Sequence, residues 1–149
     1  MQCGGKRGAE LQAIGRSRGG RSTKIHAVCD RQSRVTSFTL TPGQKGDVRV
    51  APSLIQPLPK ADYVLADAAY DSDRFRLVLT ERPTIPVIKP NPTCRNIPAF
   101  NEETYKQRNL IERAFFHLKD WLRVATRYDK LARNFEATVA LAAIIVWWS

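Results

Sequence analysis

The stretch YKQRNLIERAFFHLK, residues 105–119, carries the strongest pattern in this sequence. Apolar residues recur in it at intervals of three or four, which predicts an amphipathic helix with one buried face. The pattern begins near NEET, residues 101–104, and the apolar stripe comprises Ile111, Phe115, Leu118 and Leu122. We therefore expect one long helix from Asn101 to about Leu122.

Polar residues form a second stripe on this expected helix. It contains Tyr105, Arg108, Glu112 and Lys119, at spacings of three, four and seven. At about 100° per residue, the four lie within roughly 60° of one another. The stripe runs beside the apolar one, at the margin of the buried face, where the floor of a site would lie. An Arg–Glu pair four residues apart is also a common solvated pair of little energetic value, so both interpretations stay open.

A second candidate site residue ends the apolar run YVLAD, residues 63–67. The run predicts a buried central strand, and Asp67 stands at its carboxyl end. Sites in α/β proteins form at the carboxyl ends of sheet strands. An aspartate there can equally cap the turn or helix that follows, and we interpret Asp71, in DSD, as such a cap. For Asp67, site and cap both remain open.

The rest of the chain alternates strands and helices without an internal repeat. The turn DRQSR joins the first two strands as a hairpin, and Pro86 favours an edge position for the last strand. Asp47 is the expected N-cap of the first helix. The expected strands cover residues 24–29, 35–42, 63–67 and 84–90, and the expected helices cover 47–58, 72–82, 101–122 and 131–148. This order favours an α/β fold, with a mixed sheet flanked by helices.

The charge balance indicates a polyanionic partner. Lys and Arg total 24 against 14 Asp and Glu, which gives a formal net charge of +10. Such an excess raises affinity for nucleic acid, although ribosomal and membrane-surface proteins share it. Residues 1–22 are rich in Gly and Arg, and we expect them to be flexible. They either touch phosphates or form a solvated basic terminus. Residues 23–149 would then be one domain.

Several protein classes are disfavoured by the composition. Three cysteines, an odd number without a CxxC pair, argue against a disulfide framework and a zinc site. Two histidines far apart argue against a histidine-rich metal site. The apolar tail, residues 137–148, is shorter than the ~20 residues that span a bilayer, and no secretory signal follows Met1. We expect a cytoplasmic protein without a membrane partner, whose last helix is buried.

Asp67 and Glu112 together suggest a specific chemistry. A carboxylate at a strand end and another on a helix packed nearby can chelate Mg²⁺, a hard cation that prefers oxygen ligands. Two such ions, ~3.5–4 Å apart, activate the attacking oxygen and stabilise the leaving oxygen in phosphoryl transfer. Arg108 and Lys119 would hold phosphate oxygens and balance the carboxylate charge.

The 105–119 stretch is similar to the Tyr-x2-Arg-x3-Glu-x6-Lys signature of insertion-sequence transposases, in the families numbered four and five. LADAAYD, residues 65–71, resembles the surroundings of their second catalytic aspartate. GRSRGGRSTKIHAV (residues 15–28) and RVATRYDKLARNFEATVALAAIIVW (residues 123–147) are also similar to this group. The resemblance spans nearly the whole chain, from about Gly15 to Trp148.

The resemblance implies a DDE transposase with an RNase H-like catalytic core. It also implies two Mg²⁺ ions in an intact site, and the cutting and joining of double-stranded DNA at terminal inverted repeats. By the same resemblance, Asp67 and Glu112 would be catalytic metal ligands. Tyr105, Arg108 and Lys119 would contact the DNA end near the cleaved phosphate.

One departure from the family pattern bears on activity. The family's first aspartate lies on a strand upstream of the GRSRGG segment, and this chain has no counterpart of that strand. Asp30 is a poor substitute because it falls in the expected hairpin turn. We therefore expect an RNase H-like domain that lacks its first strand, is inactive alone, and partners either an upstream transposase half or another transposase copy.

The alternative is a basic DNA-binding protein without catalysis, which regulates full-length transposase. Carboxylate-dependent metal binding would favour the transposase site. Salt-dependent DNA binding without carboxylate dependence would favour the alternative.

Overall fold

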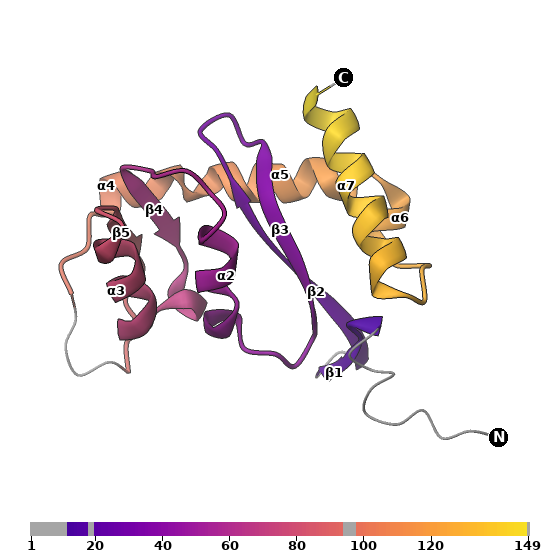
Figure 1. Ribbon diagram of the computed structural model, residues 1–149, viewed down its shortest axis with the longest axis horizontal. Helices are drawn as coiled ribbons and strands as arrows, with labels where there is room; N and C mark the ends of the chain where they lie inside the picture. Colours follow the sequence, from indigo (N-terminus) through magenta and orange to yellow (C-terminus); the bar gives the residue numbers. More distant parts are fainter. Residues whose placement is uncertain (1–11, 18–19, 94–97, 149) are drawn as a thin grey trace. The chain divides into compact units, whose positions relative to one another are not determined.

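A computed structural model describes residues 12–17, 20–93 and 98–148 (Figure 1). The chain divides into two compact units. One joins the chain up to Lys45 to the chain from Ile111 onward, and the other is the continuous segment Gly46–Leu110. Both contain helices and strands, so the α/β class expected from the sequence is confirmed. A single domain over residues 23–149 stays a prediction.

The discontinuous unit contains an antiparallel sheet in the order β1-β2-β3. Its strands are β1 (Gly15–Ser17), β2 (Gly20–Cys29) and β3 (Val35–Pro42). The predicted hairpin of β2 and β3 is confirmed. Within the glycine-rich stretch, residues 15–17 and 20–22 pair with each other as antiparallel strands. Gly20 has a φ of +102°, which glycine adopts without steric cost. The sequence also predicts that residues 1–11 are flexible, but these residues lie outside those that the structure describes.

Asp30 organises the turn between β2 and β3, as its expected position in the hairpin implies. Its side chain accepts hydrogen bonds from the backbone N–H groups of Gln32 and Arg34, at 2.8 and 3.0 Å. The Arg34 guanidinium lies 2.7 Å from its second oxygen. Burial alone would raise the pKa of Asp30, but these hydrogen bonds and the Arg34 charge outweigh burial and lower it. Its oxygens are therefore engaged in holding the turn.

Helices cover one face of this sheet and close its core. They are α5 (Asn109–Lys119), α6 (Leu122–Ala125) and α7 (Ala132–Trp148). Leu118 of α5 and Val139 of α7 are fully buried, and Ile25 and Leu40 of the hairpin pack against the same cluster. Figure 1 shows α7 beside β3. The alternating apolar pattern of the hairpin thus places one side of each strand against the helices.

The last helix matches the expected range but is not buried all round. Phe135, Val139, Ala142 and Ala143 face the core. Leu141 and Ile144 are more than half exposed on its other side. In the described parts of the chain, no helix is long and apolar enough to cross a membrane.

The continuous unit is a strand–helix–strand arrangement with short flanking helices. Its parallel pair, β4 (Tyr63–Ala66) and β5 (Ile85–Ile88), is connected through α3 (Asp73–Glu81). Phe75 and Leu79 of α3 are buried, as are Val87 and Ile88 of β5. The remaining elements are η1 (Asp47–Arg49), α2 (Ala51–Ile55), η2 (Ala68–Tyr70), α4 (Glu102–Tyr105) and η3 (Lys106–Arg108).

Three expectations for this unit are wrong. The helix predicted over residues 47–58 is a 3-10 turn followed by five α-helical residues, and its N-cap is Gly46 rather than Asp47. β4 is not a buried central strand, because among the described residues it pairs with β5 alone, in a two-stranded sheet, and Tyr63 is half exposed. The strands thus form an antiparallel sheet and a parallel sheet rather than one mixed sheet.

The long helix predicted from Asn101 to Leu122 is interrupted. Asn101 is its N-cap, since its side chain accepts a hydrogen bond from Thr104 N–H at 2.9 Å. The 3-10 segment η3 separates α4 from α5, and the extended backbone of Trp121 separates α5 from α6. Apolar spacing cannot distinguish 3.0 from 3.6 residues per turn over a single turn, so the sequence pattern did not reveal the break.

Candidate active site

Asp67 directly follows β4, and its carboxylate has two neighbours. One oxygen accepts a hydrogen bond from Ala69 N–H at 3.1 Å, which makes Asp67 the N-cap of η2. The other oxygen lies 4.0 Å from a guanidinium nitrogen of Arg108, and the side chain is 46% exposed. The cap interpretation is therefore confirmed, and it leaves one carboxylate oxygen facing Arg108 at the surface.

Arg108, which lies near Asp67, and Tyr105 both belong to the segment that precedes α5. η3, which carries Arg108, lies against β4. The Arg108 guanidinium stands 5.8 Å from the centre of the Tyr105 ring, in a cation–π arrangement. The Phe100 and Tyr105 rings pack edge to face, with ring centres 4.9 Å apart. Three of the five predicted site residues thus lie together in the continuous unit.

Tyr70 is a neighbour of this group that sequence reasoning missed. Burial raises its pKa to about 12, and the negative charges of Asp47 and Asp67 add to the effect. The shift stabilises the neutral phenol, which can donate its proton in a hydrogen bond. Tyr70 lies three residues after Asp67, within the LADAAYD stretch that resembles the family, but no role was predicted for it.

Asp71 holds the loop after β5 rather than capping a helix, so its predicted role is wrong. The carboxylate is 4% exposed, lies 2.8 Å from Arg76 Nε, and accepts a hydrogen bond from Asn91 N–H at 2.7 Å. The N-cap of α3 is Ser72, whose hydroxyl accepts from Phe75 N–H. Asp71 and Ser72 are adjacent and both favour caps, so the sequence alone could not choose between them.

Glu112 and Lys119 belong to α5 and to the other compact unit. Both side chains are exposed. Seven residues are about two helical turns, so the two project from the same side of α5. Lys119 lies in the last turn, where a positive charge is favoured by the helix dipole. The meeting of Glu112 with Asp67 stays a prediction.

Comparison with known proteins settles the family. The family described as "Transposase DDE domain" matches residues 5–147. The chain belongs to the DDE-domain transposases. It is also 37% identical over 127 residues to a Brucella ovis protein named "Putative transposase for insertion sequence element IS6501". That match covers 85% of this chain and 98% of the relative. The family suggested by the 105–119 signature, an insertion-sequence transposase, is confirmed.

The two acids predicted as metal ligands carry side chains of the kind that a hard divalent cation prefers. Asp67 and Glu112 supply carboxylate oxygens, which Mg²⁺ and similar ions prefer. Within residues 12–17, 20–93 and 98–148, no three His, Cys, Asp or Glu side chains gather as a metal-binding group. Asp67 and Glu112 therefore offer suitable chemistry, while a complete set of ligands is not assembled among these residues.

Proposed function

We propose that this chain serves DNA transposition, with Asp67 and Glu112 as the metal-holding carboxylates of its catalytic core. The observation that carries the proposal is the pairing of Asp67 with Arg108 at the end of β4. A carboxylate and a guanidinium lie side by side on a surface, which supports the roles of an anionic metal ligand and a phosphate-binding cation. Membership of the DDE-domain transposases supports the same assignment.

The protein groups have distinct roles in this proposal. Bound Mg²⁺ ions would activate the attacking oxygen and stabilise the leaving oxygen of the DNA phosphate. Arg108 balances the charge of Asp67, and at 4.0 Å the pair is loose enough for its guanidinium to turn to a phosphate. Tyr105 supports the Arg108 guanidinium from below. Lys119 contacts the DNA farther along α5.

The substrate in this proposal is the double-stranded end of an insertion sequence, at its terminal inverted repeat. The core would be RNase H-like. An antiparallel hairpin followed in the chain by a parallel strand–helix–strand unit supports that arrangement.

Metal binding tests the carboxylate roles. Mn²⁺ is titrated into the protein in a calorimeter. Asp67→Asn and Glu112→Gln should each bind Mn²⁺ at least about tenfold more weakly than the unchanged chain. Loss of a residue that only orients a metal ligand already costs about tenfold in metal affinity, and loss of the ligand itself should cost at least as much. Asp62→Asn and Glu136→Gln are matched controls, since both are exposed acids and Asp62 lies at the opposite end of β4. Equal Mn²⁺ affinity in the Asp67 and Asp62 variants would refute the assignment.

A second candidate function is DNA binding without catalysis. The net charge of +10 and the absence of a three-ligand metal group among the described residues favour it. In that case affinity for duplex DNA would fall with salt, and Mn²⁺ affinity would not depend on Asp67 or Glu112.

A further inference from the structure

β1 and β2 form a short ribbon on which two arginines stand opposite each other. Arg16 pairs with Arg21 in the antiparallel register, so both side chains project from the same face. Both are exposed. Among the residues that the structure describes, no carboxylate forms an ion pair with either of them. The ribbon thus presents two adjacent positive charges to solvent.

This pairing is unfavourable for the ribbon by itself. Like charges placed directly opposite each other destabilise a strand pair. Edge strands often carry charge to prevent pairing with other chains, and Arg16 on β1 would serve that purpose alone. Arg21 lies on β2, which is the middle strand of the sheet and needs no such protection. An anion bound to both guanidinium groups would turn the repulsion into attraction.

The opposite face of the ribbon is covered. Gly43, in the turn after β3, donates its N–H to Ser22 O at 3.0 Å. A Cβ on Gly43 would lie 2.0 Å from the Ser22 hydroxyl, so a larger residue there would require the Ser22 side chain to move. Ser22 pairs with Gly15, which is buried. Since Ser22 and Arg21 alternate along β2, the turn packs on one face and leaves the arginine face open.

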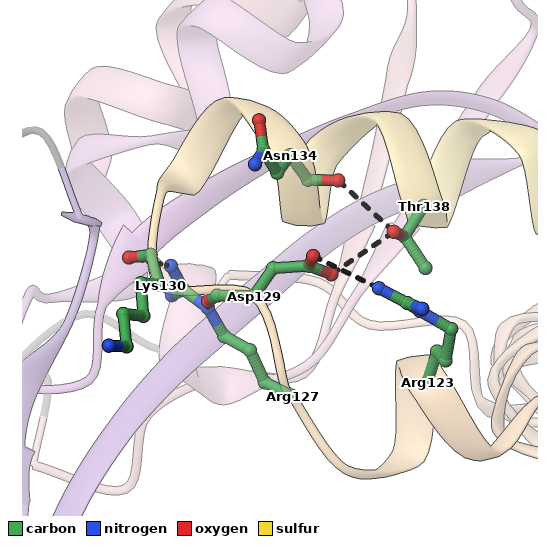
Figure 2. A network of polar contacts seen from close by, with 6 residues as sticks. All are labelled: Arg123, Arg127, Asp129, Lys130, Asn134 and Thr138. Atoms are coloured by element: carbon green, nitrogen blue, oxygen red, sulfur yellow. Dashed lines mark hydrogen bonds and ion pairs between the residues drawn. The ribbon is translucent and has the colours of Figure 1, made fainter.

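Arg127 fixes the base of the ribbon. Its guanidinium donates to Gln12 O, just before β1, at 2.6 Å, and to the hydroxyl of Thr23 on β2. The Thr23 hydroxyl in turn donates to Ala13 O at 2.7 Å. Figure 2 shows Arg127 anchored in its own loop, where it donates to Asp129 O at 2.8 Å and to Lys130 O at 3.2 Å. The ribbon is therefore held in place before any ligand arrives.

We propose that the β1–β2 ribbon binds the phosphate backbone of duplex DNA, with Arg16 and Arg21 each contacting a phosphate. Arg127 is a positioning residue for both strands. Opposite Cβ atoms in such a pair are about 5 Å apart, and long arginine side chains can spread from there to neighbouring phosphates. Backbone contacts of this kind fix orientation on the duplex and carry no sequence information. The inference rests on the proposed function only in taking DNA as the polyanion.

The test compares two double variants in a binding assay. Fluorescence anisotropy of a labelled duplex of arbitrary sequence is measured in EDTA, between about 50 and 200 mM salt. Arg16→Ala with Arg21→Ala should weaken binding and reduce the slope of log affinity against log salt by about 1.8, since each phosphate contact contributes about 0.9. Arg31→Ala with Arg74→Ala is the matched control, because it removes two exposed arginines from the β2–β3 turn and from α3.

Arg127→Lys tests positioning separately from charge. It keeps the positive charge but cannot reach Gln12 and Thr23 together through a planar fork. We expect faster hydrogen exchange at the amides of β1 and of residues 20–23, together with weaker DNA binding. Unchanged exchange and unchanged affinity would overturn the role of Arg127.

Other outcomes overturn the ribbon itself. An equal loss of DNA affinity in the two double variants would mean that DNA is attracted by the overall positive charge and not by the ribbon. If the Arg16→Ala, Arg21→Ala variant retains DNA binding but loses binding to phosphatidylserine vesicles, the ribbon binds a lipid surface instead. EDTA removes metal from the assay, so failure of the Asp67 and Glu112 assignment leaves this result unaffected. Failure of the unchanged chain to bind duplex DNA would overturn the DNA partner in both proposals.

Discussion

Asp67 shows how one side chain can satisfy two interpretations that the sequence left open. It caps η2 with one oxygen and faces Arg108 with the other. The sequence located the residue because an acid at a strand end is chemically distinctive. It could not locate Tyr70 or the buried role of Asp71, since those depend on which residues burial brings near them.

Loss of the Arg108 side chain should lower DNA affinity without lowering Mn²⁺ affinity. In Arg108→Ala, DNA affinity should fall, with a salt slope smaller by about 0.9, because one phosphate contact is lost. Mn²⁺ affinity should not fall, because a positive charge is removed from beside the carboxylate. The same two titrations on Arg74→Ala, an exposed site on α3, provide the control. A drop in Mn²⁺ affinity would contradict the proposed division of roles.

Asp71 should matter for stability far more than its neighbour Asp73. Asp71→Asn leaves the partly buried Arg76 without its anionic partner, at a cost of about 3 kcal/mol in the free energy of unfolding. Asp73→Asn changes an exposed residue in the first turn of α3 and should cost less than about 1 kcal/mol. Urea unfolding followed by circular dichroism measures both. Similar costs would mean that the Asp71–Arg76 pair contributes little.

The elements differ in how far local sequence determines them. The β2–β3 hairpin and α3 follow from alternation, turn residues and apolar spacing, and the structure confirms them. The break at η3 could not be foreseen, because one 3-10 turn disturbs the apolar stripe too little. β4 was misjudged because an apolar run signals burial without giving the number of strands beside it.

The hairpin turn should confer a pH dependence on stability. The folded state lowers the pKa of Asp30, so its contribution is present above the unfolded value of 3.8 and is lost as pH falls through the folded value. Asp30→Asn should therefore cost about 1 kcal/mol at pH 7 and progressively less below pH 3.8. Thermal unfolding across this range measures the difference, with Asp120→Asn as an exposed control. A difference independent of pH would show that the Asp30 charge plays no part.

For the whole molecule, the composition indicated the class of binding partner but gave little information about the arrangement of the chain. A net charge of +10 indicated a polyanion, and the collinear motifs indicated a transposase, which the family match confirms. The division into two units, one discontinuous, was not visible, because contacts between distant segments leave no local pattern.

The helical layer of the discontinuous unit should account for much of its stability. Leu118→Ala on α5 should cost about 2–5 kcal/mol, since the side chain is 1% exposed within the core. The same change at Leu141, which is 59% exposed on α7, should cost less than about 0.5 kcal/mol. Denaturant midpoints compare the two leucines directly. A large loss at Leu141 would reveal a packing role for the outer side of α7.

The reach of Arg127 to Gln12 spans 115 positions along the chain. A ribosome that has released residues 46–110 has already supplied every strand and helix of the continuous unit. The hairpin of the other unit, made earlier, must wait for α5, α7 and the Arg127 loop before its apolar face is covered. We therefore expect the middle of this protein to be able to fold during synthesis before the beginning does, while the early hairpin exposes its apolar face until the last helices follow.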